Sequence, residues 1–452
     1  MLECRRSRSD ILGHGIAFRL WMPNRFAIPV TTMNRRGRTP NPYRDSRWIH
    51  STRVHLSLYT LLLIATPFLM CRTFMQDTIG RMSASRFSLG SLAVPRVPIV
   101  AVVFAGLLLL LFRPRITVRR AIAVVIGLAM FAFGQQLTDF YFGHRFYELQ
   151  MNWHYLAYCL FAFLSYRHFR ERGMSLTGTL LTTVGLAALY SAVDEGLQVF
   201  ISNRVFDMSD IGKDFYGAFT GMTMVLIGGA HPELARGAWK RVRRRALQGY
   251  FTHAPSAWVL LLVTTLSFLG IASILTESEF VMLIILLALA TVIVFLAILH
   301  LSQFRWPGRV LLGLGVIIVL AQSLSFIRHR DDQIVRHEFG LTVYKGVPIP
   351  FFDVMFFPNG GFRLVDKKHY FVSRDRGFFL RRWRPDILLI GAGYNGQGGK
   401  GFPHLKGSRF IYNPFAQTGV QVIILNSSEA CDYFNRLKAQ GKNVLFVLHT
   451  TC

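Results

Sequence analysis

Nine long apolar runs constrain this chain more than any other feature. They cover residues 54–72, 97–112, 121–138, 153–166, 176–198, 214–231, 256–274, 279–300 and 309–326. A run of about 20 apolar residues spans the hydrocarbon core of a bilayer. Charged residues make up only 17% of the chain, against about 25% in soluble domains. We therefore expect a polytopic α-helical membrane bundle of about nine spans, followed by a small soluble α/β domain.

The composition divides the chain into five parts. Residues 1–53 carry eleven arginines and no long apolar run, which predicts a disordered basic arm. A first transmembrane bundle covers residues 54–231, and a basic loop covers residues 232–255. Three further transmembrane helices cover residues 256–326. The soluble α/β domain takes the remainder, residues 327–452.

Lysine and arginine are unevenly distributed between the loops. The N-terminal arm and every second loop after it carry 26 of these residues, whereas the alternate loops carry 7. Loops rich in Lys and Arg stay on the cytoplasmic side. The asymmetry predicts a multi-pass protein of the cytoplasmic membrane with its N-terminus inside. The loop between residues 194 and 214 then lies outside, and with nine spans the C-terminal domain also lies outside.

The formal net charge of +27 could indicate binding to nucleic acid or to anionic lipid. Because the basic residues lie in the arm and in loops beside the spans, membrane lipids account for them and no nucleic-acid partner is expected. The five cysteines contain no C-x-x-C pair. We therefore expect no structural zinc site, no metal and no other cofactor.

Polar residues interrupt the apolar pattern between residues 191 and 221. Ser191, Glu195 and Gln198 fall on one helix face, because residues spaced by three and four share a face. Asp210 and Asp214 share a face of a second predicted helix, which starts near Asp210 after a turn. Ionisable groups at membrane depth cost free energy and usually pair or line a polar cavity. This stretch is the predicted functional site, and a buried ion-pair network that only locks the helices together is the alternative.

These residues resemble the motif of the VanZ-like membrane proteins over roughly residues 100–230. The residues that carry the resemblance are His154, Glu195, Gln198, Arg204, Asp210, Gly217 and Gly221. Two departures are Gln150-Met151, where that family usually has Asp-Lys, and Asp214, where it usually has Asn. The resemblance implies a protein of the bacterial envelope, linked to glycopeptide-type antibiotic resistance or envelope modification. An envelope glycan or lipid-linked component is then the expected partner.

Each polar residue receives an expected role under this hypothesis. Glu195 and Asp210 are the candidate catalytic residues, with Glu195 as acid/base or hydrogen-bond acceptor. His154, Gln198, Arg204 and Asp214 are the candidate ligand-binding residues, and Arg204 would hold an anionic group. The sequence does not decide whether any reaction is catalysed.

From about residue 327 short strand patterns replace the apolar runs. Residues 341–344, 354–357, 386–390, 420–425 and 444–448 read as strands, and a helix should begin after Asn426 and stop at Gly441. The pattern after residue 390 fits G-x-G-x-x-G but cannot open a helix, and no acidic residue follows near position 411. A flexible loop, or a backbone nest for an anion, is therefore expected rather than a dinucleotide site.

Residues 337–450 resemble a small α/β domain family that includes a mitochondrial complex I assembly factor. The resemblance rests on Trp383, on residues 385–393 and 419–422, and on the segment from Ala430 to Leu437. No catalytic residue follows from this resemblance. It does support an alternative function, a membrane-anchored scaffold or assembly factor that acts through this domain. A transporter subunit is the third hypothesis, although the sequence shows no clear internal repeat.

Overall fold

The computed structural model describes most of the chain after the basic arm. The described residues are 51–452 without 71–72, 91, 113–115, 139–147, 202–205, 230, 235, 240–244, 332, 372, 403–408 and 452. Nearly all of the predicted arm, residues 1–53, therefore lies outside the described part, as does Arg204.

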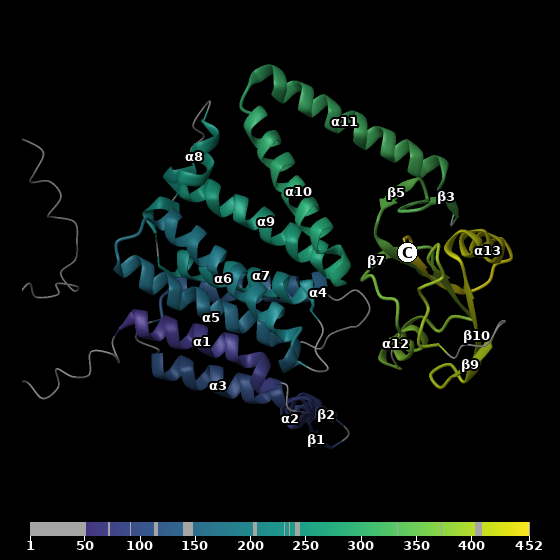
Figure 1. The fold of residues 1–452 in the computed structure, drawn as a ribbon, viewed down its shortest axis with the longest axis horizontal. Helices are drawn as coiled ribbons and strands as arrows, with labels where there is room; N and C mark the ends of the chain where they lie inside the picture. The colour runs from purple at the N-terminus through teal and green to yellow at the C-terminus, as the bar shows by residue number, and fades with distance from the viewer. Residues whose placement is uncertain are drawn as a thin grey trace, which may run out of the picture. The chain divides into compact units, whose positions relative to one another are not determined.

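Helices occupy all nine ranges in which spans were expected (Figure 1). The helices of this part are α1 (Thr52–Met70), α2 (Thr73–Ala84), α3 (Arg96–Phe112), α4 (Val118–Thr138), α5 (Leu149–Glu171), α6 (Leu176–Gln198), α7 (Met208–Gly228), α8 (Leu247–Thr252), α9 (Ala254–Ile274), α10 (Val281–Leu301) and α11 (Arg305–Arg328). A hairpin of β1 (Arg86–Leu89) and β2 (Leu92–Pro95) separates α2 from α3.

Six of the described helices are long and apolar enough to cross a membrane: α1, α4, α6, α9, α10 and α11. The predicted count of nine spans is therefore not confirmed. The remaining three candidates differ for simple reasons. Helix α3 is shorter, whereas α5 and α7 carry many polar side chains, including His154 on α5 and the charged residues Asp210, Lys213 and Asp214 on α7.

Helix α7 lies at the centre of the helical part. Its sequence buries 16 of 21 residues and packs against α4, α5, α6 and α9. Gly217 and Gly221 allow the closest approach. A Cβ atom at Gly217 would lie 2.8 Å from the carbonyl oxygen of Tyr155, and one at Gly221 would lie 2.5 Å from that of Cys159. The small-residue spacing of residues 217 and 221 therefore brings α7 directly onto the backbone of α5.

The C-terminal domain contains a six-stranded sheet in the order β7-β6-β11-β8-β10-β9. The strands are β6 (Asp353–Phe356), β7 (Phe362–Val365), β8 (Ile387–Ala392), β9 (Arg409–Asn413), β10 (Thr418–Leu425) and β11 (Val444–His449). Strands β10 and β11 both run parallel to β8, and helix α13 (Ser427–Ala439) connects them. This connection is the predicted β-α-β unit, with β8 inserted between its two strands.

Two apolar layers cover the sheet. Phe434 of α13 packs with Phe356 and Phe446 on one side, and Phe379 of helix α12 (Ser373–Trp383) belongs to the core on the other. A separate three-stranded sheet has the order β3-β4-β5, with β3 (Ile334–Glu338), β4 (Leu341–Tyr344) and β5 (Val347–Pro350). Helix–sheet–helix layering gives the domain its own hydrophobic core.

Two polar contacts and one apolar contact join the C-terminal domain to one end of the helical part. The backbone N–H of Lys367 donates to the carbonyl of Ile274 at 2.8 Å, and His369 pairs with Glu277 at 2.9 Å. Phe352 packs against the apolar cluster that contains Met208, near the start of α7. The domain therefore contacts the same end of the helices at which α7 begins.

Candidate functional site

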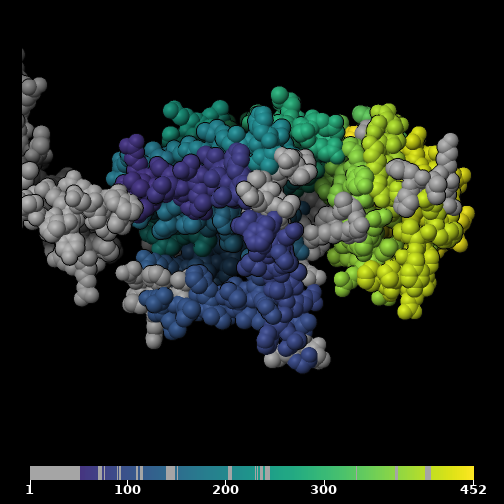
Figure 2. Space-filling view, turned by 60° about the horizontal axis from the view of Figure 1, so that its bottom comes forward, coloured from purple at the N-terminus to yellow at the C-terminus, as the bar shows by residue number. Residues whose placement is uncertain are grey.

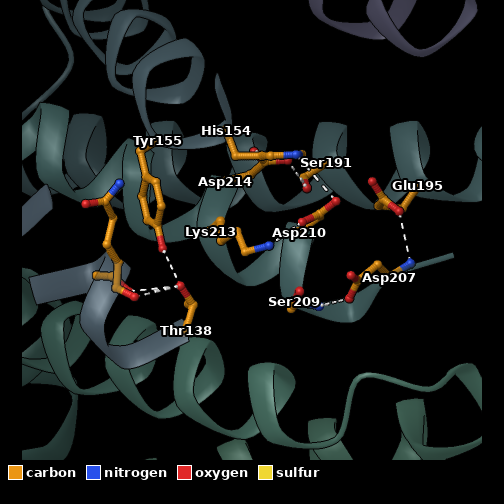
Figure 3. Close-up of polar contacts among 12 residues, drawn as sticks. Thr138, His154, Tyr155, Ser191, Glu195, Asp207, Ser209, Asp210, Lys213 and Asp214 are labelled. Atoms are coloured by element: carbon orange, nitrogen blue, oxygen red, sulfur yellow. Dashed lines mark hydrogen bonds and ion pairs between the residues drawn. The ribbon is translucent and has the colours of Figure 1, made fainter. Parts of the chain in front are cut away.

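His154 and Asp214 form the centre of a buried polar network where α5 meets α7 (Figure 3). The His154 Nδ1 atom lies 2.9 Å from Asp214 Oδ1, and Nε2 lies 3.4 Å from Asp210 Oδ2. Ser191 of α6 donates its hydroxyl hydrogen to the other Asp214 oxygen at 2.6 Å. Asp214 is only 1% exposed. Residues from three helices thus meet at the Asp214 carboxylate, which holds the His154 imidazole in a fixed position.

Lys213 supplies a cation to the same network. Its ammonium group donates to Asp210 Oδ1 at 2.6 Å, and its side chain is 7% exposed. Asp210 thus accepts from Lys213 and lies beside His154. Because Lys213 and Asp210 are spaced by three on a helix, their pairing follows directly from the sequence.

Glu195 belongs to a second group of polar contacts at the junction between α6 and α7. Gln198 donates its side-chain amide hydrogen to one Glu195 oxygen, and the backbone N–H of Asp207 donates to the other at 3.1 Å. Asp207 caps α7 by accepting from the backbone N–H of Ser209 at 2.8 Å. Glu195 is 0% exposed. Its carboxylate therefore fastens the end of α6 to the start of α7.

A cavity of about 590 Å³ opens beside the His154 network. Apolar side chains of α1, α2 and the start of α5 form most of its wall, among them Leu62, Met75 and Leu156. Thr66 of α1 is polar, and the ionisable and amide lining residues come from α5, α6 and α7: His154, Asp194, Gln198, Asp210 and Asp214. Helix α1 lies on the outer surface of the helical part (purple in Figure 2). The cavity is thus apolar over much of its wall and carries carboxylates on the helices opposite.

Five of the six predicted site residues lie in the same region of the structure. They form two groups, of which one lines the cavity. His154, Gln198, Asp210 and Asp214 line the cavity, whereas Glu195 does not. Arg204 lies outside the described residues. Glu195 accepts two hydrogen bonds, which fits the expected role as hydrogen-bond acceptor, whereas its acid/base role stays a prediction.

Three residues of the candidate site were not predicted as site residues. Lys213 pairs with Asp210, Asp207 caps α7, and Asp194 lines the cavity. Asp194 had a signal in the sequence, because it precedes Gln198 by four residues and shares its helix face. Among the described residues, none donates a hydrogen bond to the buried Oδ1 atom of Asp194.

A second buried polar cluster lies in the C-terminal domain. Asp353 accepts from His449 Nδ1 at 2.6 Å and from Lys367 Nζ at 2.9 Å, and Lys367 also donates to Thr451 at 2.7 Å. Asp353 and His449 are 0% exposed and Lys367 is 1% exposed. No substrate could touch this cluster without rearrangement, so we regard it as structural.

The loop after β8 does not open a helix. Gly393, Gly396 and Gly399 adopt positive φ values of 85°, 66° and 77°, and residue 400 forms isolated bridges with residues 370 and 402. The dinucleotide fingerprint requires a helix at this point. The prediction that no helix follows this G-x-G-x-x-G match is confirmed over residues 393–402, whereas the choice between a flexible loop and an anion nest stays a prediction.

No group of three or more His, Cys, Asp or Glu side chains within the described residues could hold a metal ion. The carboxylates of the cavity are separated by their pairings with Lys213, His154 and Ser191. What the arrangement offers chemically is a fixed imidazole, several carboxylates and an apolar wall.

Comparison with known proteins adds little. No protein-family model matches the chain, and no curated protein matches it. One solved structure, "MT938", is similar over 26% of this chain and 98% of that chain, at 17% identity and with a TM-score of 0.20. No argument rests on so low a score. Neither family resemblance gains support from these comparisons, and both stay predictions.

Proposed function

We propose that this chain is an integral membrane protein that binds an amphiphilic component of the bacterial envelope. The single observation that carries the proposal is the cavity of about 590 Å³ with an apolar wall and a cluster of polar residues. Ligand sites in proteins usually measure about 300–1,000 Å³ and combine a mostly apolar lining with a few placed polar groups. An acyl or alkyl chain suits the apolar wall, and a polar head suits the carboxylates.

The contacts of the polar residues favour a binding role over a purely structural one. A network that only locked helices together would have no need to line a cavity. Here Asp194 lines the cavity, and its buried Oδ1 atom has no hydrogen-bond partner among the described residues. His154, Asp210 and Asp214 are held in place by neighbours, and all three line the cavity. Such preorganised groups are typical of ligand sites.

The VanZ-like resemblance supplies the biological context of the proposal. Under it, the bound component is a lipid-linked or glycan-bearing molecule of the envelope, and its handling affects sensitivity to glycopeptide-type antibiotics. Asp210 and His154 replace Glu195 as the candidate acid/base pair, because both line the cavity.

The proposal is tested in a bacterial strain from which the chromosomal gene has been deleted. Wild-type or variant protein is then supplied from a plasmid. We expect His154→Gln and Asp214→Asn to lose at least tenfold in glycopeptide tolerance relative to wild type, because each removes one partner of the central ion pair. Immunoblots of membrane fractions check that the variants accumulate equally.

Glu171→Gln is the matched control. Glu171 is half-exposed at the end of α5, pairs with Arg167 at 3.5 Å and does not line the cavity. It should leave tolerance unchanged. If His154→Gln and Asp214→Asn behave like Glu171→Gln, the cavity plays no part in the phenotype and the scaffold hypothesis for the C-terminal domain takes precedence.

A further inference from the structure

The charge of the polar lining restricts which amphiphile fits. We propose that the cavity selects an amphiphile with a cationic head, an ammonium group on an apolar chain, over one with an anionic head. This inference rests on the proposed function, because it names the chemical class of ligand for the same cavity. It departs from the sequence-based expectation that Arg204 holds an anionic group.

Carboxylates outnumber cationic groups among the described residues of the site. Three carboxylates line the cavity, those of Asp194, Asp210 and Asp214. Lys213 and a protonated His154 are the described cations that pair with them, and both pair only with Asp210 and Asp214. A carboxylate without a cationic partner is costly in an apolar setting. A ligand cation would remove that cost.

Asp194 is the cavity-lining carboxyl group that forms no ion pair with a described residue. Lys213 contacts Asp210, and His154 contacts Asp214 and Asp210. By contrast, Asp194 lines the cavity, and its buried Oδ1 atom has no hydrogen-bond partner among the described residues. A carboxylate oxygen accepts hydrogen bonds, and an ammonium group donates up to three. A turn of this side chain toward the cavity would offer the unpaired acceptor to an amine head.

Aromatic side chains strengthen the case for a cation. Trp153 and Tyr158 both line the cavity, one half-exposed and the other buried. Aromatic faces attract ammonium groups. A phosphate or carboxylate head would instead face Asp194, Asp210 and Asp214, and like charges at such close quarters repel.

The test compares three probes that share a twelve-carbon chain. They are dodecylammonium, dodecanol and dodecyl phosphate, titrated against the purified full chain in micelles of a bulky sugar detergent. Binding is followed by calorimetry. We expect dodecylammonium to bind at least tenfold more tightly than dodecyl phosphate, with dodecanol between them.

Asp194→Asn identifies the responsible residue. It should reduce the affinity ratio of dodecylammonium to dodecanol by about tenfold, which corresponds to about 1.4 kcal/mol. Asp194→Glu keeps the charge and should retain most of the preference, which separates charge from folding. Glu171→Gln, outside the cavity, should bind all three probes as wild type does. A preserved ratio in Asp194→Asn would overturn the assignment to Asp194.

Failure of this inference can be told apart from failure of the proposed function. If dodecyl phosphate binds as tightly as dodecylammonium, the head-group inference is wrong, while binding of amphiphiles stands. Leu156→Trp fills the apolar wall and should weaken all three probes. If no probe binds, or if Leu156→Trp weakens none of them, the cavity is not an amphiphile site and both proposals are wrong.

Discussion

Asp353 shows how a buried charge is accommodated in the C-terminal domain. Burial acts to raise the pKa of this carboxyl group, but the neighbouring His449 and Lys367 and the hydrogen bonds that it accepts outweigh burial. The pKa is therefore held well below its usual value. An acid with a depressed folded pKa stabilises the fold above its unfolded pKa of about 3.9. That stabilisation is lost as the pH falls below about 3.9 toward the folded pKa.

Removal of Lys367 should expose the cost of this buried carboxylate. Lys367→Met leaves Asp353 with one fewer partner, and breaking a buried ion pair usually costs about 3–5 kcal/mol. We expect the domain of the variant to unfold at lower urea concentration. Thiol labelling of Cys431, which is free and 3% exposed in the domain core, reports this unfolding by peptide mass spectrometry.

The pH dependence provides the check on that prediction. In wild type, protection of Cys431 should persist from pH 7 to about 4 and decline below, because protonation of Asp353 then weakens its ion pairs. Lys442→Met is the control, since Lys442 is exposed in the same domain and lies outside the cluster. If Lys367→Met and Lys442→Met unfold at the same urea concentration, the cluster does not stabilise the domain.

Residue spacing predicted much of the candidate site, although not all of it. The i, i+3 spacing placed Glu195 and Gln198 on one helix face, and the i, i+4 spacing placed Asp210 and Asp214 on another. The helices that carry these faces meet as expected. Spacing could not show that Glu195 does not line the cavity. That outcome depends on how α6 and α7 join, and the backbone N–H of Asp207 donates to Glu195 at this junction.

At the scale of elements, the length of the apolar runs predicted where helices form. It predicted less well how many of these helices are long and apolar enough to cross a membrane. Each expected run became a helix, because continuous apolar sequence of this length has few other stable forms at membrane depth. In the C-terminal domain, the buried strands β8 and β11 were predicted because they are continuously apolar. Helix α12 and edge strand β9 were missed, since charged and exposed residues mask their periodicity.

The contact between α5 and α7 depends on two glycines. Gly217→Ala and Gly221→Ala each place a methyl group against the backbone of α5, at Tyr155 and Cys159. Overpacking of this kind costs about 1–3 kcal/mol. We expect both variants to lower the thermal unfolding midpoint of the protein in detergent and to weaken the pairing of His154 with Asp214, because those residues lie on the same two helices.

Gly185→Ala is the matched control for this packing prediction. Gly185 lies on α6, and a Cβ atom there would meet no atom within 4 Å. Alanine also favours helices over glycine by about 1 kcal/mol. Gly185→Ala should therefore leave the midpoint equal or higher. Equal midpoints for all three variants would show that the helices do not approach as closely as the structure describes.

At the scale of the whole molecule, the path of the chain links the site to the C-terminal domain. Met208 and Ile211 at the start of α7 pack with Ala272 and Leu275 at the end of α9. Lys367 of the C-terminal domain bonds to Ile274 in the same region. The polar site and the domain therefore belong to one end of the helices, whichever number of them spans the membrane.

The loop charges predict which side of the membrane this end faces. Lys and Arg are concentrated in the loops at the opposite end of α7 and α9, which should keep that end cytoplasmic. Phe200→Cys near the end of α6 and Tyr412→Cys in the C-terminal domain replace exposed residues. Both should react with a membrane-impermeant maleimide in intact cells, as judged by peptide mass spectrometry.

Leu247→Cys in α8 is also exposed but should stay unlabelled until the cells are broken. Labelling of Leu247→Cys alone would reverse the predicted orientation. Labelling of only one of the other two variants would contradict their placement at one end of the helices.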